Sequence, residues 1–331
     1  MNLSDLKGCI TDVPGFYLGH AQDEAARTGV SVVLCPPGTV GACELRGTAT
    51  ATRGMDALRA EHLVGGVDAI VLTGGSAFGL ASADGVMAFL EEQGRGFPTG
   101  RFNVPTVAAG VLFDLHFGDG RVRPDAAMGR AACEAASNEE GPQGSVGAGM
   151  GATIGKLFGQ ERAMKGGLGT ASMNLPGGGV VGAVAAVNAF GGVYEPGTGK
   201  PVAGPRAMPP EQGIVDTEEH LRIHGRPFEG FSNTSENTTL VAVATNARLT
   251  KTETHKLAQM AANGLIRTVR PSYSTVDGDM VFALSCGERE VALDVVGTAA
   301  IEAVGHAICR AVMEADGRGI IPAWRDLPES L

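Results

Sequence analysis

Residues 237–251 read NTTLVAVATNARLTK, and the interpretation of the whole chain depends on this stretch. The apolar run TLVAVAT within it has the length and the β-branched content of a buried strand. Thr250 and Glu253 then match a capping box, which predicts a helix from there to about residue 268. The stretch therefore predicts a strand that is followed directly by a helix.

The chain after this helix predicts a second strand and a second helix. VDGDMVFALSC, from residue 276, indicates a turn into a strand, and helical spacing follows from about residue 290 to 314. A strand-helix-strand-helix unit cannot bury both faces of its sheet alone. We therefore expect it to complete a sheet that begins in the N-terminal part.

The N-terminal part also mixes buried strands with helices, which predicts an α/β protein. Apolar runs such as GVSVVLC and VVGAVAAVNAF indicate strands, and no internal repeat of solenoid length is visible. The predicted strands cover residues 29–35, 67–75, 104–113 and 180–190, and a predicted helix covers residues 77–90.

Between Tyr194 and Asn237 the sequence becomes polar and rich in proline, with little periodicity. We expect no regular structure there. A structureless segment of this length within a compact chain is more often functional than a simple connector.

Composition excludes several classes of protein. With 331 residues, 44% of them hydrophobic and 19% charged, the chain is long and apolar enough for a large core. A net charge of −10 argues against a nucleic-acid partner. The six cysteines form no Cys-x-x-Cys pair, which favours free thiols in a reducing compartment. We see no secretory signal and no stretch approaching the roughly 18 apolar residues of a membrane span, so we expect a cytoplasmic protein without a membrane partner.

The junction between Asn237 and Thr238 allows two interpretations. On composition alone, Thr238 is a β-favouring residue entering a sheet. A threonine at a chain terminus can also act as a nucleophile, because its own α-amine, with a pKa of about 7.7–8.0, can serve as the base. To create that terminus, the hydroxyl would attack the Asn237 carbonyl, form an ester and let water release it.

The quoted stretch resembles the cleavage site of the DmpA-type aminopeptidase family, and more closely that of its nylon-oligomer hydrolase branch. The resemblance covers most of the chain through ITDVPGFYLGH, TGVSVVL, LTGGSAFGLASADGVM, SVGAGMGATIGK, KGGLGTAS and AVNAFGGV. It implies a four-layer αββα sandwich of the DmpA/ArgJ-like type. It also implies one autoprocessed domain, cut into residues 1–237 and 238–331, and a homotetramer of cleaved subunits.

The same resemblance gives a role to Asp277 and Asp279. Without it, the Asp-Gly pair is a hairpin-turn signal, and a lone D-x-D is weak evidence for a metal. In the nylon-oligomer branch, two aspartates at this distance orient the hydroxyl and the amine of the nucleophile. The peptidase branch uses a serine nucleophile with a serine and a glutamate, and this chain departs from that pattern at all three positions.

Asn188 and Lys156 complete the predicted catalytic set. Asn188 interrupts an apolar strand and is either a structural amide or, as the resemblance implies, an oxyanion donor. Lys156 matches the family lysine beside the nucleophile, where its charge would lower the pKa of the neighbouring amine, and Lys165 is the alternative.

No cofactor or metal is expected. Gly74-Gly75-Ser76 lacks the spacing of a phosphate loop or a nucleophile elbow, so we expect its glycines to let backbone pass closely at a packed corner. The seven histidines are dispersed, and we expect no two of them on one helical turn and no zinc site.

These observations lead to one hypothesis and its alternatives. We expect a self-cleaving amide hydrolase that works through an acyl-enzyme on linear amides or peptides, such as 6-aminohexanoate oligomers. The alternatives are an aminopeptidase that releases N-terminal residues, an acyltransferase of the ornithine acetyltransferase type, and an uncut binding protein without activity.

Overall fold

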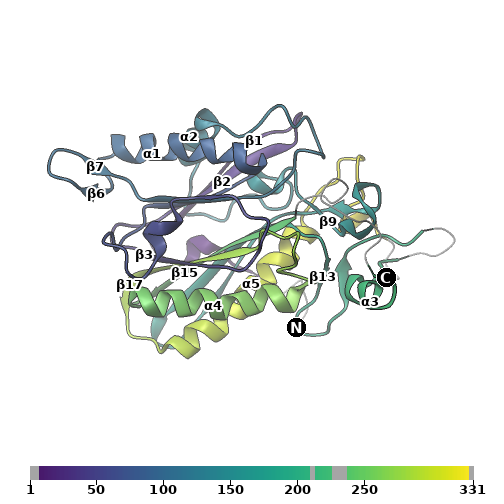
Figure 1. The fold of residues 1–331 in the computed structure, drawn as a ribbon. Helices are drawn as coiled ribbons and strands as arrows, with labels where there is room; N and C mark the ends of the chain where they lie inside the picture. The colour runs from purple at the N-terminus through teal and green to yellow at the C-terminus, as the bar shows by residue number, and fades with distance from the viewer. Residues whose placement is uncertain (1–6, 209–212, 226–236, 328–331) are drawn as a thin grey trace.

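The computed structural model describes residues 7–208, 213–225 and 237–327, and its two main sheets lie face to face between two pairs of helices (Figure 1). The first sheet has the strand order β1-β2-β5-β8-β4, and helices α1 and α2 cover its outer face. These elements are β1 (Tyr17–Asp23), β2 (Thr28–Leu34), β4 (Thr52–Arg53), β5 (Ala69–Thr73), β8 (Val107–Val111), α1 (Ser82–Glu92) and α2 (Ala126–Glu134).

The second sheet has the order β11-β12-β15-β17-β3, and helices α4 and α5 cover its outer face. Strand β15 pairs antiparallel with β12 and parallel with β17. The C-terminal unit thus completes a sheet begun by the N-terminal part, as the sequence predicts. These elements are β3 (Val40–Leu45), β11 (Gly167–Asn174), β12 (Val180–Asn188), β15 (Thr238–Ala247), β17 (Met280–Arg289), α4 (Lys251–Thr268) and α5 (Leu293–Met313).

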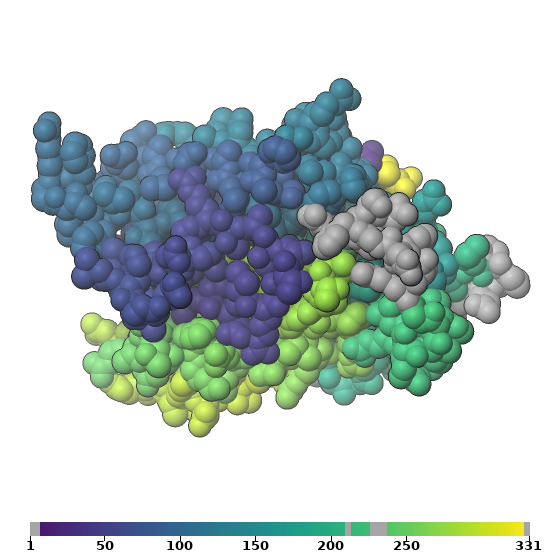
Figure 2. Space-filling view, in the orientation of Figure 1, coloured from purple at the N-terminus to yellow at the C-terminus, as the bar shows by residue number. Residues whose placement is uncertain are grey.

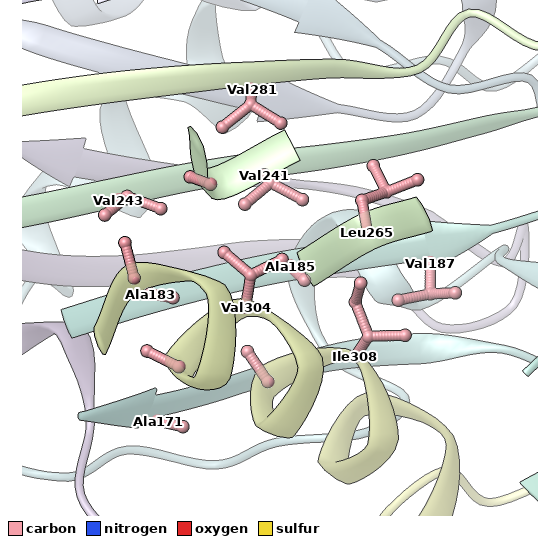
Figure 3. Close-up of a cluster of buried hydrophobic side chains, with 14 of the residues drawn as sticks. Ala171, Ala183, Ala185, Val187, Val241, Val243, Leu265, Val281, Val304 and Ile308 are labelled. Carbon is pink, nitrogen blue, oxygen red and sulfur yellow. The ribbon is translucent and has the colours of Figure 1, made fainter. Parts of the chain in front are cut away.

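Strand β15 shows how alternation along a strand fills two layers of core. Leu240 and Ala242 belong to the cluster between the two sheets, whereas Val241 and Val243 face the helices. Figure 3 shows Val241 and Val243 beside Val304 of α5. Because successive side chains of a strand point to opposite faces, one apolar run supports both layers. The predicted four-layer αββα sandwich is therefore confirmed.

Shorter elements connect these layers. The Tyr194 to Asn237 segment, which we expected to be irregular, contains strand β14 (Pro201–Ala203) and helix α3 (Thr217–His224), so the expectation was wrong for these residues. Asp216 accepts a hydrogen bond from the Glu219 N–H and so caps α3. The Pro209-Pro210 pair of that segment lies outside the described residues. The remaining short strands are β6 (Phe97–Pro98), β7 (Asn103–Val104), β9 (Thr153–Ile154), β10 (Met164–Lys165), β13 (Gly192–Tyr194) and β16 (Val269–Arg270).

Helix α5 is apolar enough and long enough to meet the composition test for a membrane span, with a mean hydropathy of 1.4. The expectation that no stretch approaches such a composition was therefore wrong. The physical reason is its place in the fold, since 67% of the apolar window is buried inside the protein, where α5 packs on β11 and β12. Among the described residues it is the one helix that meets the test.

Candidate active site

The sheet order brings three distant segments together at the start of β15. Thr238, the first residue of that strand, lies opposite Asn188 of β12. On its other side, Asn237 forms a parallel bridge with Asp277, just before β17. Thr238 is 2% exposed and Asn188 is fully buried. The predicted nucleophile and two of its predicted partners thus share one buried end of the sheet.

The Asn237 carbonyl group is held by two donors. The Thr238 Oγ1 hydroxyl donates to the Asn237 oxygen at 2.6 Å, and the Gly278 N–H donates to the same oxygen at 2.6 Å. The Asn237 N–H in turn donates to the Val276 oxygen at 3.1 Å. The peptide bond before Thr238 is therefore fixed on the turn that carries the two aspartates.

Asp277 and Asp279 are each 1% exposed, and main-chain donors anchor both carboxylates. Asp277 Oδ2 accepts the Ser274 N–H at 3.1 Å and also the Ser274 hydroxyl. Asp279 accepts the Thr239 N–H at 2.6 Å on Oδ1 and the Tyr273 N–H at 2.8 Å on Oδ2. Asp279 therefore positions the residue that follows Thr238.

Burial controls the charge of this aspartate pair. Burial raises the pKa of the Asp277 carboxyl, while its bonds from Ser274 oppose the rise. Burial, and then the neighbouring Asp277 charge, raise the pKa of Asp279 well above its usual range. Burial and mutual repulsion therefore both disfavour the state in which the two carboxylates are charged at the same time.

The Asn188 amide has a defined orientation. Its Oδ1 accepts the Lys156 Nζ at 2.8 Å and the Thr153 N–H at 2.9 Å, so this end must be oxygen. Its Nδ2 donates to the Phe113 oxygen at 2.9 Å. A side-chain amide carries two N–H groups, so the nitrogen can serve a second acceptor besides Phe113.

The two candidate lysines differ in their surroundings. The Lys156 Nζ contacts Asn188 Oδ1 and also Asn188 O, at 3.0 Å. Burial lowers the Lys156 pKa to about 7, and the charges of Asp277, Asp114 and Asp279 oppose this shift. The Lys165 Nζ instead donates to three main-chain oxygens, each at 2.8 Å, on Gly149, Ala152 and Gly166. Lys156 is thus the lysine attached to the Asn188 site.

A pocket of about 330 Å³ opens beside Thr238. Small and hydroxyl-bearing side chains dominate its wall, and no charged side chain of the described residues lines it. Part of the wall is the segment after β3, which lies at the surface between the two helix layers in Figure 2. The lining residues are Thr48, Ala49, Thr50, Ala51, Ser76, Ala77, Val111, Phe113 and Thr238.

The Gly74-Gly75-Ser76 turn contributes to this pocket through packing. A Cβ at Gly74 would lie 2.1 Å from Asp114 Oδ2, and Gly75 has a φ of 80°. The corner is packed as predicted, but at Gly74 the missing side chain makes room for the Asp114 carboxylate and not for backbone, while Gly75 adopts a φ that other residues rarely allow. Ser76, with a φ of 53°, is held in the left-handed region and reaches the pocket wall.

The expectation about histidines was wrong for one pair. His220 and His224 lie four residues apart on α3, and their ring centroids are 4.9 Å apart. In the described part of the chain, no group of three or more His, Cys, Asp or Glu side chains could hold a metal ion.

Several contributors to the site gave little or no sequence signal. Ser274 and Gly278 belong to the turn around the aspartates, and Phe113 belongs to the end of the first sheet. The pocket wall at residues 48–51 comes from almost 190 positions before Thr238. Only the sheet topology brings these segments together. The Asp-Gly turn signal is the one local hint that pointed toward Gly278.

Comparison with known proteins identifies the family. The model of peptidase family S58 matches residues 8–320. The chain belongs to this family. An uncharacterized aminopeptidase of Mycobacterium bovis is 40% identical over 96% of this chain and 97% of its own length. A 6-aminohexanoate-oligomer endohydrolase of an Agromyces species is 31% identical over 85% of this chain and 75% of its own length. The protein is therefore a hydrolase that acts on amide bonds.

Solved structures share its fold. A Burkholderia β-aminopeptidase superposes with a TM-score of 0.69 at 24% identity, over 96% of this chain and 91% of that one. The L-aminopeptidase D-Ala-esterase/amidase of Ochrobactrum anthropi, described as a variant of the Ntn hydrolase fold, gives a TM-score of 0.69 at 20% identity. It covers 93% of this chain and 86% of that one. The four-layer sandwich is thus the fold of these aminopeptidases.

Proposed function

We propose that the chain cuts itself between Asn237 and Thr238 and then hydrolyses amides with Thr238 as the N-terminal nucleophile. The observation that carries the proposal is the position of Thr238. Its hydroxyl lies 2.6 Å from the carbonyl oxygen of the preceding peptide, and its side chain also forms part of a pocket wall. Cleavage would leave fragments 1–237 and 238–331 within one sheet, because β15 stays paired with β12.

In the cut protein, the Thr238 α-amine would take the hydroxyl proton as Oγ1 attacks the substrate carbonyl carbon. The negative charge would form on the substrate oxygen, and the second N–H of Asn188, the one not bonded to Phe113, would donate a hydrogen bond to that oxygen. The carbon–nitrogen bond then breaks and the amine leaves with a proton. Water cleaves the resulting Thr238 ester, which restores the hydroxyl and releases the acid.

The buried charges around Thr238 have supporting roles. Asp279 holds the Thr239 N–H and thereby fixes the start of β15, while Asp277 organises the preceding turn. Lys156 holds the Asn188 amide oxygen, which turns the amide nitrogen toward the main-chain oxygen of Phe113, a residue of the pocket wall. When protonated, Lys156 would also lower the pKa of the new α-amine and stabilise the oxyanion.

The pocket chemistry bears on the substrate. Its described wall carries hydroxyl and methyl groups and no carboxylate that would bind a substrate ammonium. This favours an uncharged linear segment beside the cut bond, as in a 6-aminohexanoate oligomer or within a peptide. The relatives named aminopeptidases favour the second candidate, release of single N-terminal residues. Product analysis on an oligomer separates the two, because internal cuts give intermediate lengths and the aminopeptidase gives monomers from the start.

The nucleophile is tested by two neighbouring substitutions. Thr238→Ala should abolish amide hydrolysis, whereas Thr239→Ala, also a buried threonine of β15, should retain it to within about tenfold. Full activity in the Thr238→Ala protein would refute the proposal. The homotetramer and the cytoplasmic location stay predictions, which analytical ultracentrifugation and cell fractionation check.

A further inference from the structure

The main-chain N–H of Gly278 is placed where negative charge would develop during self-cleavage. Its nitrogen lies 2.6 Å from the Asn237 oxygen, just below the usual range of about 2.7–3.2 Å for this kind of hydrogen bond. The Thr238 hydroxyl contacts the same oxygen. When that hydroxyl turns to attack the Asn237 carbon, the Gly278 donor can stay on the oxygen.

The turn that carries Gly278 is anchored from the opposite side. The Ala49 N–H donates to the Asp277 oxygen at 3.1 Å, and the Gly47 N–H donates to the Asp279 oxygen at 3.2 Å. These two bonds fix the residues on either side of Gly278. A donor that is already oriented needs no reorganisation when charge forms, which is the condition under which a hydrogen bond lowers a barrier most.

Only glycine fits at this position. A Cβ at Gly278 would lie 2.5 Å from the Ala49 oxygen and 2.6 Å from Thr238 Oγ1, which is too close for either contact. The missing side chain lets the backbone approach the nucleophile and the carbonyl group that precedes it.

Asn188 lies on the other flank of Thr238. Strand β15 runs between β12, which ends in Asn188, and β17, which follows Gly278. The Asn188 nitrogen bonds to Phe113 of the pocket wall, whereas Gly278 bonds to the Asn237 oxygen. We infer that the chain has two separate oxyanion donors, the Gly278 N–H for cutting itself and the Asn188 amide for its substrate.

The inference rests on the proposed function, and its chemical step is balanced. The Thr238 Oγ1 bonds to the Asn237 carbon and loses its proton, and the carbonyl electron pair moves to the oxygen that faces Gly278. When the pair returns, the bond from that carbon to the Thr238 nitrogen breaks, and the nitrogen takes up the proton that the hydroxyl lost. Water then hydrolyses the ester to the Asn237 carboxyl group and the Thr238 hydroxyl.

The test removes one N–H and leaves every side chain in place. Cell-free translation of the full chain with glycolic acid at position 278 replaces the Gly278 N–H by an ester oxygen. The matched control carries glycolic acid at Gly94, whose N–H also donates to a main-chain oxygen, that of Glu91 at 2.8 Å, but at the end of α1 and away from this turn. We expect self-cleavage to slow by on the order of 100-fold or more in the first protein, and by less than about fivefold in the control. Equal rates in the two proteins would overturn the inference.

Substrate turnover separates this role from a structural one. Once the Gly278 ester protein has been cut to completion, it should hydrolyse amide with a kcat close to that of the unaltered protein, because Asn188 serves that step. An equal loss in both reactions contradicts the assignment of separate donors. If the unaltered chain is never cut, the proposed function itself fails, which is a different result.

A second measurement does not depend on the ester protein folding. In the full-length Thr238→Ala chain, the Gly278 amide proton should resonate downfield and exchange slowly with solvent, since its nitrogen lies 2.6 Å from the Asn237 oxygen. Exchange at the rate of an exposed amide would show that the donor is not in place.

Discussion

Asn188 can be altered at the single atom that the proposed mechanism uses. The Asn188→Asp substitution keeps the oxygen that accepts Lys156 Nζ and the Thr153 N–H, and it replaces the nitrogen that faces the Phe113 oxygen. The side chain keeps its size. The change therefore removes the proposed oxyanion donor and preserves both acceptor contacts.

The size of the effect follows from the contacts that are lost. Removing one oxyanion donor lowers kcat by roughly 100- to 1,000-fold, or about 3–4 kcal/mol in barrier. The new oxygen also opposes the Phe113 oxygen, which costs about 1–3 kcal/mol of folding free energy, and attraction to Lys156 offsets part of this. The Asn188→Asp protein should therefore stay folded under assay conditions, and its loss in kcat should be larger than the fraction of unfolded protein can explain. Self-cleavage, which Gly278 supports, should stay within about tenfold.

The assay measures acid release from a linear 6-aminohexanoate oligomer by liquid chromatography, well below the unfolding temperature. Asn246→Asp is the matched control, because Asn246 also accepts a main-chain N–H, that of Val180, and donates to the Gly178 oxygen, at the far end of β15. It should retain kcat to within about threefold. An Asn188→Asp protein with a kcat within about fivefold of the parent would refute the role of this amide.

Three further predictions concern the stability of the Thr238→Ala chain. In each case the free energy of unfolding is measured by urea titration, and each further substitution is made in that chain. Lys156, whose pKa burial lowers to about 7 from roughly 10.4 when unfolded, binds fewer protons in the fold between these values. The contribution of Lys156 to the free energy of unfolding therefore rises by about 1.4 kcal/mol per pH unit in that window. From pH 7.5 to 9.0 the free energy of unfolding should rise by about 2 kcal/mol less in the Lys156→Met protein than in its parent. An unchanged slope would contradict this. In Asp279→Asn, an NH₂ donor replaces one of the two oxygens that accept the Thr239 and Tyr273 N–H groups. The free energy of unfolding should fall by about 1–3 kcal/mol. An unchanged value would show that these two hydrogen bonds do not stabilise the fold. Phe282→Ala, in the core between the sheets, should cost about 3–5 kcal/mol, against about 0.5 kcal/mol or less for the exposed Phe102→Ala, and equal costs would argue against the layered core.

Elements with strong local signals were predicted well from the sequence. The capping box at Thr250 marks the start of α4, and the apolar run after Thr238 forms β15. Both signals are short-range. The capping box of α4 is formed within one helical turn, and the side chains of β15 alternate between the two faces of the sheet every two residues. The predicted strand over residues 104–113 was too long, because regular pairing with β5 extends only over Val107–Val111.

Elements with weak local signals were predicted poorly. Helix α3 lies in a polar, proline-rich region, and an aspartate cap together with the ring contact between His220 and Phe158 supports it where periodicity does not. The apolar composition of α5 reflects burial against the second sheet, which no single window of sequence can reveal.

The candidate site was only partly visible in the sequence. Thr238, Asn188 and the two aspartates were named from resemblance, and the structure places them at one end of the second sheet. Their contacts depend on pairing between strands about 50 and 40 residues apart, so spacing alone does not predict them. The Gly278 N–H is a main-chain group, and a sequence pattern cannot show where such a group points.

Intact-mass analysis of the freshly purified full chain tests the central claim most directly. The account predicts two fragments, residues 1–237 and 238–331, with threonine at the new N-terminus by Edman sequencing, and one uncut mass for the Thr238→Ala protein. A single full-length mass in an unaltered preparation that still hydrolyses amides would contradict it.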